Sequence, residues 1–242
     1  MVHTLPDYTT KYRLSTIFSQ VDVAELAARL GSPNVWDRRG NIIWYDTINS
    51  TGNKWNKASN GTGGSSTVSS EYAMFGDYSM KLVGGSDGLK QASMYKKFQL
   101  ITVGNLGLEC AFSTNNNVDY FLLQFEYRDN NIVQDGRIKV DRTNALLRYM
   151  DQNQVYQTIA SDLKFATDFT LFNTLKLVVD NKNAEYVRVI YCDEEYDISG
   201  IPTRTFASAT MGYFSVFLQI FSNAGSNGTG YVDYFIITQN EP

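Results

Sequence analysis

The segment from residue 173 to residue 200 constrains the fold most strongly, because it has the pattern of two strands joined by a tight polar turn, followed by a third short strand. Residues 174–179 and 186–191 alternate in character from one position to the next, as strands do when successive side chains point to opposite faces. Between them, Asp180-Asn181-Lys182-Asn183 favours a turn, because Asp and Asn side chains bond to their own backbone and tolerate left-handed conformations. Antiparallel hairpins of this kind build sandwiches and barrels.

Similar patterns recur along most of the chain, with turn residues between them and no alternation of strands with helices. Charged residues are only 19% and Gly, Asn, Ser and Thr are abundant, which favours strands and turns over long helices. All-β chains of 242 residues are often one domain. The sequence therefore predicts an all-β protein, an antiparallel β-sandwich of jelly-roll type. Besides the hairpin, strands are expected at about 41–47, in two runs within 68–83, and at about 90–102, 105–113, 118–129, 132–140, 144–151, 154–161, 211–221 and 230–238.

The N-terminal part differs from the rest of the chain. Residues 1–21 are polar and predict an extended arm, and Asp22–Leu30 predicts one short helix, with Asp22 as N-cap and Glu25 completing a capping box. A helix this short is marginal alone, so its apolar face must dock, either on its own sandwich or on a neighbouring subunit. We therefore expect an arm and helix over residues 1–35 and a sandwich over residues 36–242. The apolar face comprises Val23, Leu26, Ala27 and Leu30.

Several functional classes are excluded or disfavoured by what the chain contains. The net charge is −4 and basic residues do not cluster, so nucleic-acid binding is not expected. The single histidine, His3, rules out Ser-His-Asp and Cys-His chemistry and multi-histidine metal sites. No segment is long enough to span a bilayer and the N-terminus has no continuous apolar run, so we expect synthesis in the cytoplasm without a signal peptide. Cys110 and Cys192 fall in separate predicted strands, and the sequence leaves open whether they pair or stay free.

Residues 42–238 resemble the concanavalin A-like lectin/glucanase superfamily and related jelly-roll carbohydrate-binding modules. The resemblance is carried by Phe75–Leu82, by Leu175–Asp180 with Tyr186–Val189, and by the closing strand Tyr231–Thr238. In addition, Ala24–Gly31 followed by Asp37–Trp44 looks like the leader of phage and prophage virion proteins that carry such a sandwich.

The resemblance directs attention to three sets of candidate site residues. Glycoside hydrolases of this fold carry Glu-x-Asp-x-x-Glu on one strand, but here Glu195-Tyr-Asp197 lacks the third acid, so a solvated strand edge is the simpler interpretation. Jelly-roll modules often hold a structural Ca²⁺, for which Asp46, Asn49 and Asp233 are the candidate ligands. Sugar rings pack on aromatic faces, and the candidates for that contact are Trp55 in a predicted loop over Ser50–Ser66, Tyr72 and Tyr196, with packing in the core as the alternative role.

The sequence favours a non-enzymatic structural protein of a particle or filament, such as a phage virion, decoration or coat component. It would associate with itself, through Val23, Leu26 and Leu30 among others, and with other coat proteins, and it would act at the surface of a virion or extracellular particle. A carbohydrate-binding module that recognises a surface polysaccharide is the alternative, and a glycoside hydrolase is third. No cofactor beyond the hypothetical Ca²⁺ is expected.

Overall fold

The computed structural model describes residues 37, 39–48, 54–101, 103–129, 131–166, 168–209 and 211–242. The chain divides into two compact units, Met1–Arg38 and Arg39–Pro242, and the strands of the described residues belong to the second. The predicted arm and helix, residues 1–35, lie outside the described residues. In the described part of the chain, no helix is long and apolar enough to cross a membrane.

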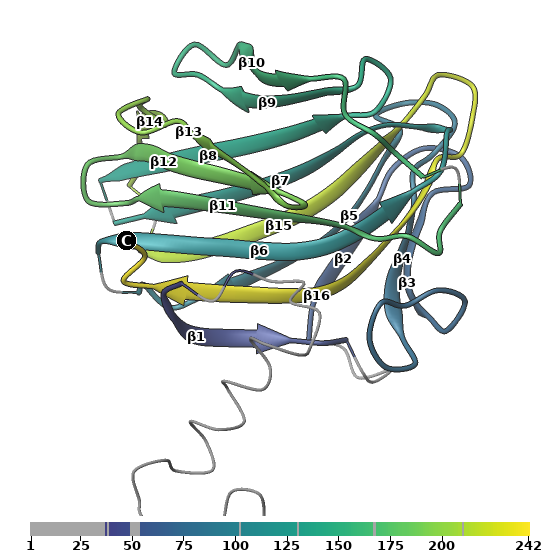
Figure 1. The fold of residues 1–242 in the computed structure, drawn as a ribbon, viewed down its shortest axis with the longest axis horizontal. Coiled ribbons are helices and arrows are strands. Elements are labelled where there is room, and N and C mark those ends of the chain that lie inside the picture. Colours follow the sequence, from purple (N-terminus) through teal and green to yellow (C-terminus); the bar gives the residue numbers. More distant parts are fainter. Residues whose placement is uncertain are drawn as a thin grey trace, which may run out of the picture. The chain divides into compact units, whose positions relative to one another are not determined.

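The second unit is the predicted antiparallel β-sandwich (Figure 1). The first sheet runs in the order β13-β12-β11-β6-β16-β4-β3, and β1 also pairs with β16. The second sheet runs in the order β10-β9-β8-β7-β15-β5-β2, and β14 pairs with β8. The first sheet comprises β1 (Asn41–Asp46), β3 (Ser65–Ser69), β4 (Ser79–Val83), β6 (Asn105–Thr114), β11 (Asn173–Asp180), β12 (Glu185–Tyr191), β13 (Glu194–Asp197) and β16 (Thr229–Gln239). The second comprises β2 (Asn56–Ser59), β5 (Gln91–Phe98), β7 (Val118–Arg128), β8 (Ile132–Asp141), β9 (Leu146–Met150), β10 (Tyr156–Ser161), β14 (Arg204–Ala207) and β15 (Tyr213–Ser222).

The hairpin that the sequence predicts most clearly is confirmed. β11 and β12 pair antiparallel, with Leu177 opposite Val189. The Asp180 carboxylate closes the turn by accepting the backbone N–H groups of Lys182 and Asn183 at 2.8 and 3.2 Å. Because the turn chemistry and the alternation lie within one short segment, no distant contact is needed to predict them.

The core lies between the two sheets and is built from inward-facing residues of most of the strands. Phe112 of β6 stacks on Phe121 of β7 across the sandwich, with ring centroids 3.9 Å apart. On β8 the inward position opposite Phe125 is Gly136, where an added Cβ would lie only 2.1 Å from the Phe125 ring. The close approach of that ring therefore requires glycine at this point of β8.

One predicted loop is wrong in part. The structure places β2 and the start of β3 within Ser50–Ser66, which the sequence predicts as a loop around Trp55. Both strands are short and polar, so their sequence carries little strand signal. They form because the edges of β5 and β4 offer backbone partners, at Tyr95 opposite Asn56 and Val83 opposite Ser65.

Candidate functional site

The outer face of the second sheet carries an unusual concentration of polar and aromatic side chains. On β7, Leu123 and Phe125 belong to the core, so Gln124 and its alternate neighbours face away from it. The same alternation applies to β5, β8 and β15. We call this surface the polar face, and its members are Gln91, Ser93, Tyr95, Lys97, Tyr120, Leu122, Gln124, Glu126, Arg128, Asp135, Arg137, Lys139, Asp141, Arg148, Arg204, Tyr213, Ser215, Phe217, Gln219 and Phe221.

A row of hydrogen bonds crosses the polar face over four strands. Gln91 of β5 donates to Gln219 of β15, whose Nε2 donates to Gln124 Oε1 of β7 at 3.1 Å. Gln124 Nε2 then donates to Asp135 Oδ1 of β8 at 3.0 Å. Gln219 and Gln124 each accept from one neighbour and donate to the next, whereas Gln91 donates at the end of the row, so the row fixes the orientation of these amides.

Basic side chains hold the carboxylates of the polar face. Asp135 accepts hydrogen bonds from Arg137 at 2.6 and 3.0 Å and from Arg204 at 3.4 Å. Asp141 pairs with Lys139 at 3.2 Å and with Arg148 at 3.6 Å. These two carboxylates are buried, at 2% and 1% exposed, whereas the four basic side chains remain partly exposed. The cations are therefore the more accessible partners in both groups.

The ion pairs also shift the pKa values of the groups that form them. Neighbouring Asn144 and Lys139 hold the pKa of Asp141 below its usual range against the opposing effect of burial. For Arg137, the contacts with Asp135 raise the guanidinium pKa despite partial burial. Both groups are thus charged at neutral pH, and the polar face is a fixed array of ions and amides.

Aromatic rings flank the hydrogen-bonded row. Tyr95 of β5 stacks on Phe217 of β15 with ring centroids 5.4 Å apart. Towards the other end of these strands, Tyr120 stacks on Phe221 at 4.4 Å. Lys139 Nζ lies 4.1 Å from the centroid of the Tyr120 ring, in cation–π contact. Rings, amides and charges together make a surface suited to a ligand that has both hydroxyl groups and apolar faces.

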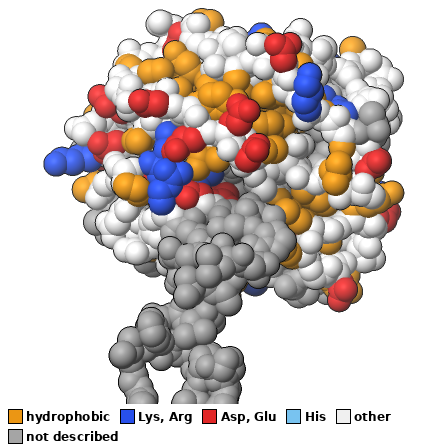
Figure 2. Space-filling model, viewed as in Figure 1, with side chains coloured by type: hydrophobic (Ala, Val, Ile, Leu, Met, Phe, Trp, Pro, Cys, Tyr) orange, Lys and Arg blue, Asp and Glu red, His pale blue; other side chains and the backbone are white. Residues whose placement is uncertain are grey.

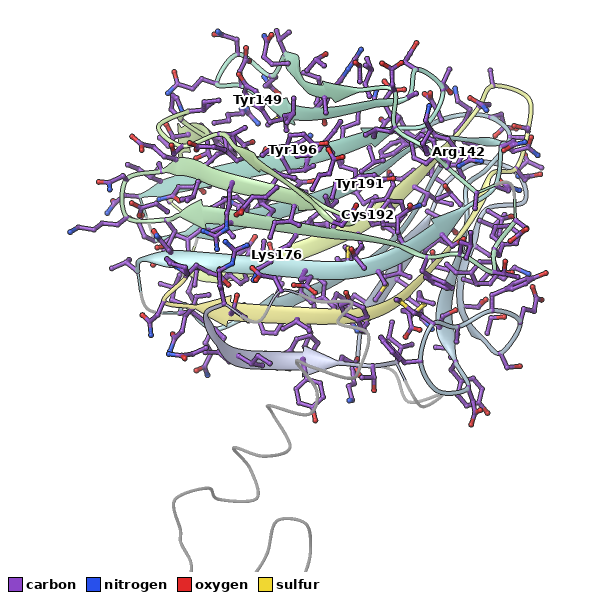
Figure 3. All side chains as sticks on the ribbon, viewed as in Figure 1. Arg142, Tyr149, Lys176, Tyr191, Cys192 and Tyr196 are labelled. Carbon is purple, nitrogen blue, oxygen red and sulfur yellow. The ribbon has the colours of Figure 1, made fainter. Side chains whose placement is uncertain are left out.

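The outer face of the first sheet is also polar, but its charges are mutually satisfied. Lys176 Nζ of β11 lies 2.7 Å from Glu241 Oε1, and Arg188 of β12 lies 2.5 Å from Glu241 Oε2. Figure 2, which views this side, shows acidic and basic side chains side by side, and Figure 3 labels Lys176 on β11. Lys176 and Glu241 are buried, so this network has the character of structural ion pairs.

The carboxylates singled out from the sequence, Glu195 and Asp197, lie on the outer side of β13 at the edge of the first sheet. Glu195 pairs with Arg188 at 2.9 Å and with Arg39 at 3.1 Å. Asp197 accepts the backbone N–H of Ser199 at 2.9 Å, which accounts for the lowered pKa of its carboxyl group. Both carboxylates therefore have local structural partners.

Trp55 does not face solvent, which corrects its assignment as a sugar-stacking residue in a loop. Its side chain is 3% exposed and packs edge-on against Trp44 and Phe235. The indole Nε1–H donates to Asp46 Oδ2 at 3.0 Å. Pairing of β2 with β5 draws the residue into the sandwich, so its role is packing in the core, the alternative noted above.

The other two aromatic candidates differ from each other. Tyr72 is 37% exposed and contacts the rings of Phe169 and Tyr231, with centroids 5.1 and 5.2 Å away. Tyr196 packs against the core, and its hydroxyl donates to Glu194 Oε1 at 2.7 Å (Figure 3). Neither residue belongs to the polar face.

The candidate calcium ligands differ in the partners that already surround them. Asp46 is occupied by Trp55, by Lys54 at 3.0 Å and by the Ile48 N–H at 3.2 Å, and Asn49 lies outside the described residues. Asp233 lies on β16, the strand that pairs with β1, and its Oδ2 accepts the N–H groups of Met74 and Phe75. Among the described residues, no group of three or more His, Cys, Asp or Glu side chains could hold a metal ion.

Asp233 nevertheless has a feature that suits a cation. Its Oδ1 is buried without a hydrogen-bond partner, and burial raises the pKa of the carboxyl group to about 6. A carboxylate oxygen in this state fits Ca²⁺, which takes oxygen ligands from carboxylates and backbone carbonyls. The residues present fit a calcium ligand at Asp233 and do not fit one at Asp46.

The two cysteines are free thiols, Cys110 buried in β6 and Cys192 exposed after β12. Burial raises the pKa of the Cys110 thiol. The pKa of the Cys192 thiol is also raised, because the surrounding protein desolvates it in part although the residue reaches the surface. Between their strands lies β11, whose Leu175 is opposite Cys110. The sequence leaves open whether Cys110 and Cys192 form a disulfide, and in the structure they are unpaired.

No protein-family model matches the chain, and no curated protein matches it. Solved structures do match it. An endo-β-1,4-glucuronan lyase from the fungus Trichoderma reesei is 10% identical, with a TM-score of 0.57 over 83% of this chain and 96% of that one. A carbohydrate esterase from the Shiga toxin-encoding bacteriophage phi24B is 14% identical, with a TM-score of 0.52 over 77% and 90%. The carbohydrate recognition domain of Emp47p is 14% identical, with a TM-score of 0.52 over 84% and 99%.

At these identities the likeness concerns the fold. The chain has the concanavalin A-like jelly-roll architecture that its strand motifs predict. The expected likeness to phage virion leaders is not specifically shown and stays a prediction.

The polar face is not predicted from the sequence. The signal available was the alternation in β7, where Tyr120, Gln124, Glu126 and Arg128 occupy outward positions. That alternation shows that the face is polar. It does not show which strands lie beside β7, and so it could not join these residues to Gln219 or Asp135.

Proposed function

We propose that the protein binds carbohydrate through the polar face, without acting on it chemically. The observation that carries this proposal is the row from Gln91 through Gln219 and Gln124 to Asp135. Gln219, Gln124 and Asp135 are only 6%, 7% and 2% exposed, so the row holds the more exposed side chains around it in fixed directions. Little conformational freedom is then lost when those side chains bind the hydroxyl groups of a sugar. The neighbouring Tyr95–Phe217 pair offers apolar surface.

The solved structures support the same class of function. Their names describe a glucuronan lyase, a carbohydrate esterase and a carbohydrate recognition domain. Those activities belong to those proteins, and only the shared architecture connects them with this chain. Here the carboxylates Asp135 and Asp141 are each held by two basic side chains, an arrangement that suits binding better than proton donation.

Affinity electrophoresis in gels that contain a panel of neutral and acidic polysaccharides would test the proposal. Tyr95 is partly exposed on the polar face, whereas Tyr45 is 64% exposed on β1 of the first sheet and provides a matched control. We expect retention of the parent protein by at least one polysaccharide. Tyr95→Ala should weaken that retention by about tenfold, which corresponds to about 1.4 kcal/mol, and Tyr45→Ala should leave it unchanged.

The same samples should be sized by light scattering, because the self-associating structural protein remains the competing hypothesis. A stable oligomer that no polysaccharide retains would contradict carbohydrate binding and favour that hypothesis. Retention that both tyrosine variants share equally with the parent would place the sugar on a different surface.

A further inference from the structure

We propose that the polar face recognises an anionic polysaccharide, whose sugar units carry carboxylate or sulfate groups. This inference rests on the proposed carbohydrate-binding function and names its ligand class. Among the described residues of the face, six basic side chains accompany three acidic ones, so the face has an excess of three positive charges on a chain whose net charge is −4. The basic residues are Lys97, Arg128, Arg137, Lys139, Arg148 and Arg204, and the acidic residues are Glu126, Asp135 and Asp141.

The excess charge is available to a ligand because two of the acids are already shared. Asp135 is divided between Arg137 and Arg204, and Asp141 between Lys139 and Arg148. One carboxylate cannot neutralise two cations. The second cation in each group keeps donor capacity for an anion supplied from outside.

Arg148 and Lys97 show this unused capacity most directly. Arg148 Nη1 lies 3.6 Å from Asp141 Oδ2, beyond hydrogen-bond distance, and the side chain is 25% exposed. Lys97 is exposed, makes no ion pair with the described residues, and lies 4.5 Å from the centroid of the Tyr213 ring. A ring positions an ammonium group without cancelling its charge. These two side chains lie on β9 and β5, at opposite sides of the face.

The chemistry of these donors selects acceptors that carry charge. Ammonium and guanidinium groups only donate hydrogen bonds, and the planar guanidinium fork matches a carboxylate or sulfate with two parallel bonds. Moreover, the rings of Tyr120 and Tyr213 are in contact with Lys139 and Lys97. Recognition at these points would therefore come from charge and hydrogen bonds more than from stacking on a ring.

The extent of the face indicates a polymer. From β5 to β9 there are four strand intervals, or about 19 Å at about 4.8 Å each. A single small anion would meet only one or two of the cations. The three carboxylates and the amide row interrupt the positive charge, which suits a chain with spaced anions and many hydroxyl groups better than the continuous phosphates of a nucleic acid.

The test compares four polymers by isothermal titration, each at the same series of ionic strengths: polygalacturonate, dextran sulfate, a neutral β-glucan and single-stranded DNA. Lys97→Gln and Arg148→Gln each remove one charge from the face. Lys182→Gln removes one exposed charge from the turn between β11 and β12 and is the matched control. Thermal melting of each variant checks folding. Lys97 is exposed and has no ion pair with the described part of the chain to lose, so it keeps the test decisive if Arg148→Gln is unstable.

We expect tighter binding to polygalacturonate, dextran sulfate or both than to the neutral glucan, with affinity falling as salt increases. The comparison of the first two identifies carboxylate or sulfate as the group recognised. Lys97→Gln and Arg148→Gln should each weaken binding by about tenfold, equivalent to about 1.4 kcal/mol, and Lys182→Gln by less than about twofold.

Other results would overturn the inference in distinguishable ways. Equal binding of the neutral glucan would refute anionic selectivity while leaving carbohydrate binding intact. Binding of no glycan would refute the proposed function itself. DNA binding as tight as that of the glycans, or equal losses in Lys182→Gln and the two face variants, would show general attraction of polyanions in place of a site.

Discussion

Replacing Asp135 by Asn tests whether the polar face is held together by its central carboxylate. Asp135 is 2% exposed and accepts hydrogen bonds from Gln124, Arg137 and Arg204. The substitution keeps the shape of the side chain but removes its charge. It also turns one acceptor into an NH₂ donor that points towards guanidinium groups. Both arginines would then lose the counter-charge that balances their partial burial.

The magnitude follows from how deeply the arginines are buried. Removing one partner of a fully buried ion pair costs about 3–5 kcal/mol. The side chains of Arg137 and Arg204 are 26% and 25% exposed, so water compensates part of the loss. We therefore expect Asp135→Asn to lower the free energy of unfolding by about 2–3 kcal/mol, below the fully buried range because of solvent screening. For a chain of this size that corresponds to a fall in Tm of about 4–12 °C.

Urea denaturation followed by circular dichroism at low ionic strength would measure this loss, and a double-mutant cycle would locate its cause. Arg137→Gln in the Asp135→Asn background removes the guanidinium left without its partner. The two changes together should therefore cost less than the sum of the single changes, by about 1–2 kcal/mol. A loss below about 0.5 kcal/mol for Asp135→Asn, typical of an ordinary surface change, would refute the reasoning. Purely additive single changes would show that the carboxylate and Arg137 act independently.

Four further predictions concern other parts of the chain. In excess chelator, the Tm of the parent should fall as pH rises from about 4 towards 6, because burial raises the folded-state pKa of Asp233 to about 6 and so favours the protonated carboxyl group. Asp233→Asn should abolish this pH dependence of Tm. Excess calcium should raise the Tm of the parent but not that of the variant. Trp55→Ala should cost about 3–5 kcal/mol by urea denaturation, because it empties a core position and removes the donor to the Asp46 carboxylate; a loss below about 1 kcal/mol would mean that the indole is not packed as described. Neither the parent nor Glu195→Gln should release reducing sugar from β-glucans, and release by the parent that is lost in the variant would establish a hydrolase. Deleting residues 1–35 should leave a soluble, cooperatively melting, β-rich monomer by light scattering, whereas the full chain should be oligomeric; a full chain that stays monomeric would end the self-association hypothesis.

The sequence predicts those features whose causes lie close together in the chain. The β11–β12 hairpin is one, since the Asp180 carboxylate and the amides that it caps lie within three residues of one another. The closing strand is another, because Tyr231–Thr238 is a continuous run rich in aromatic and β-branched residues, which favours a strand by itself. These elements determine the class of fold, and the class in turn explains the likeness to solved jelly-roll structures.

The candidate site could not be predicted in the same way, because its causes are distant in the chain. Gln91 and Gln219 are 128 positions apart, and Gln219 and Gln124 are 95 apart. Only the placement of β15 between β5 and β7 brings them into one row. The prediction that Trp55 stacks on a sugar is wrong for the same reason, since the pairing of β2 with β5 determines that its side chain is buried. In an antiparallel sandwich the local pattern shows which side chains point outward, and the order of the strands decides which of them meet. The most informative residues to mutate are therefore Gln124 and Asp135. Each has partners on two other strands, β15 and β8 for Gln124 and β7 and β14 for Asp135, so their contacts cannot be predicted from any single segment.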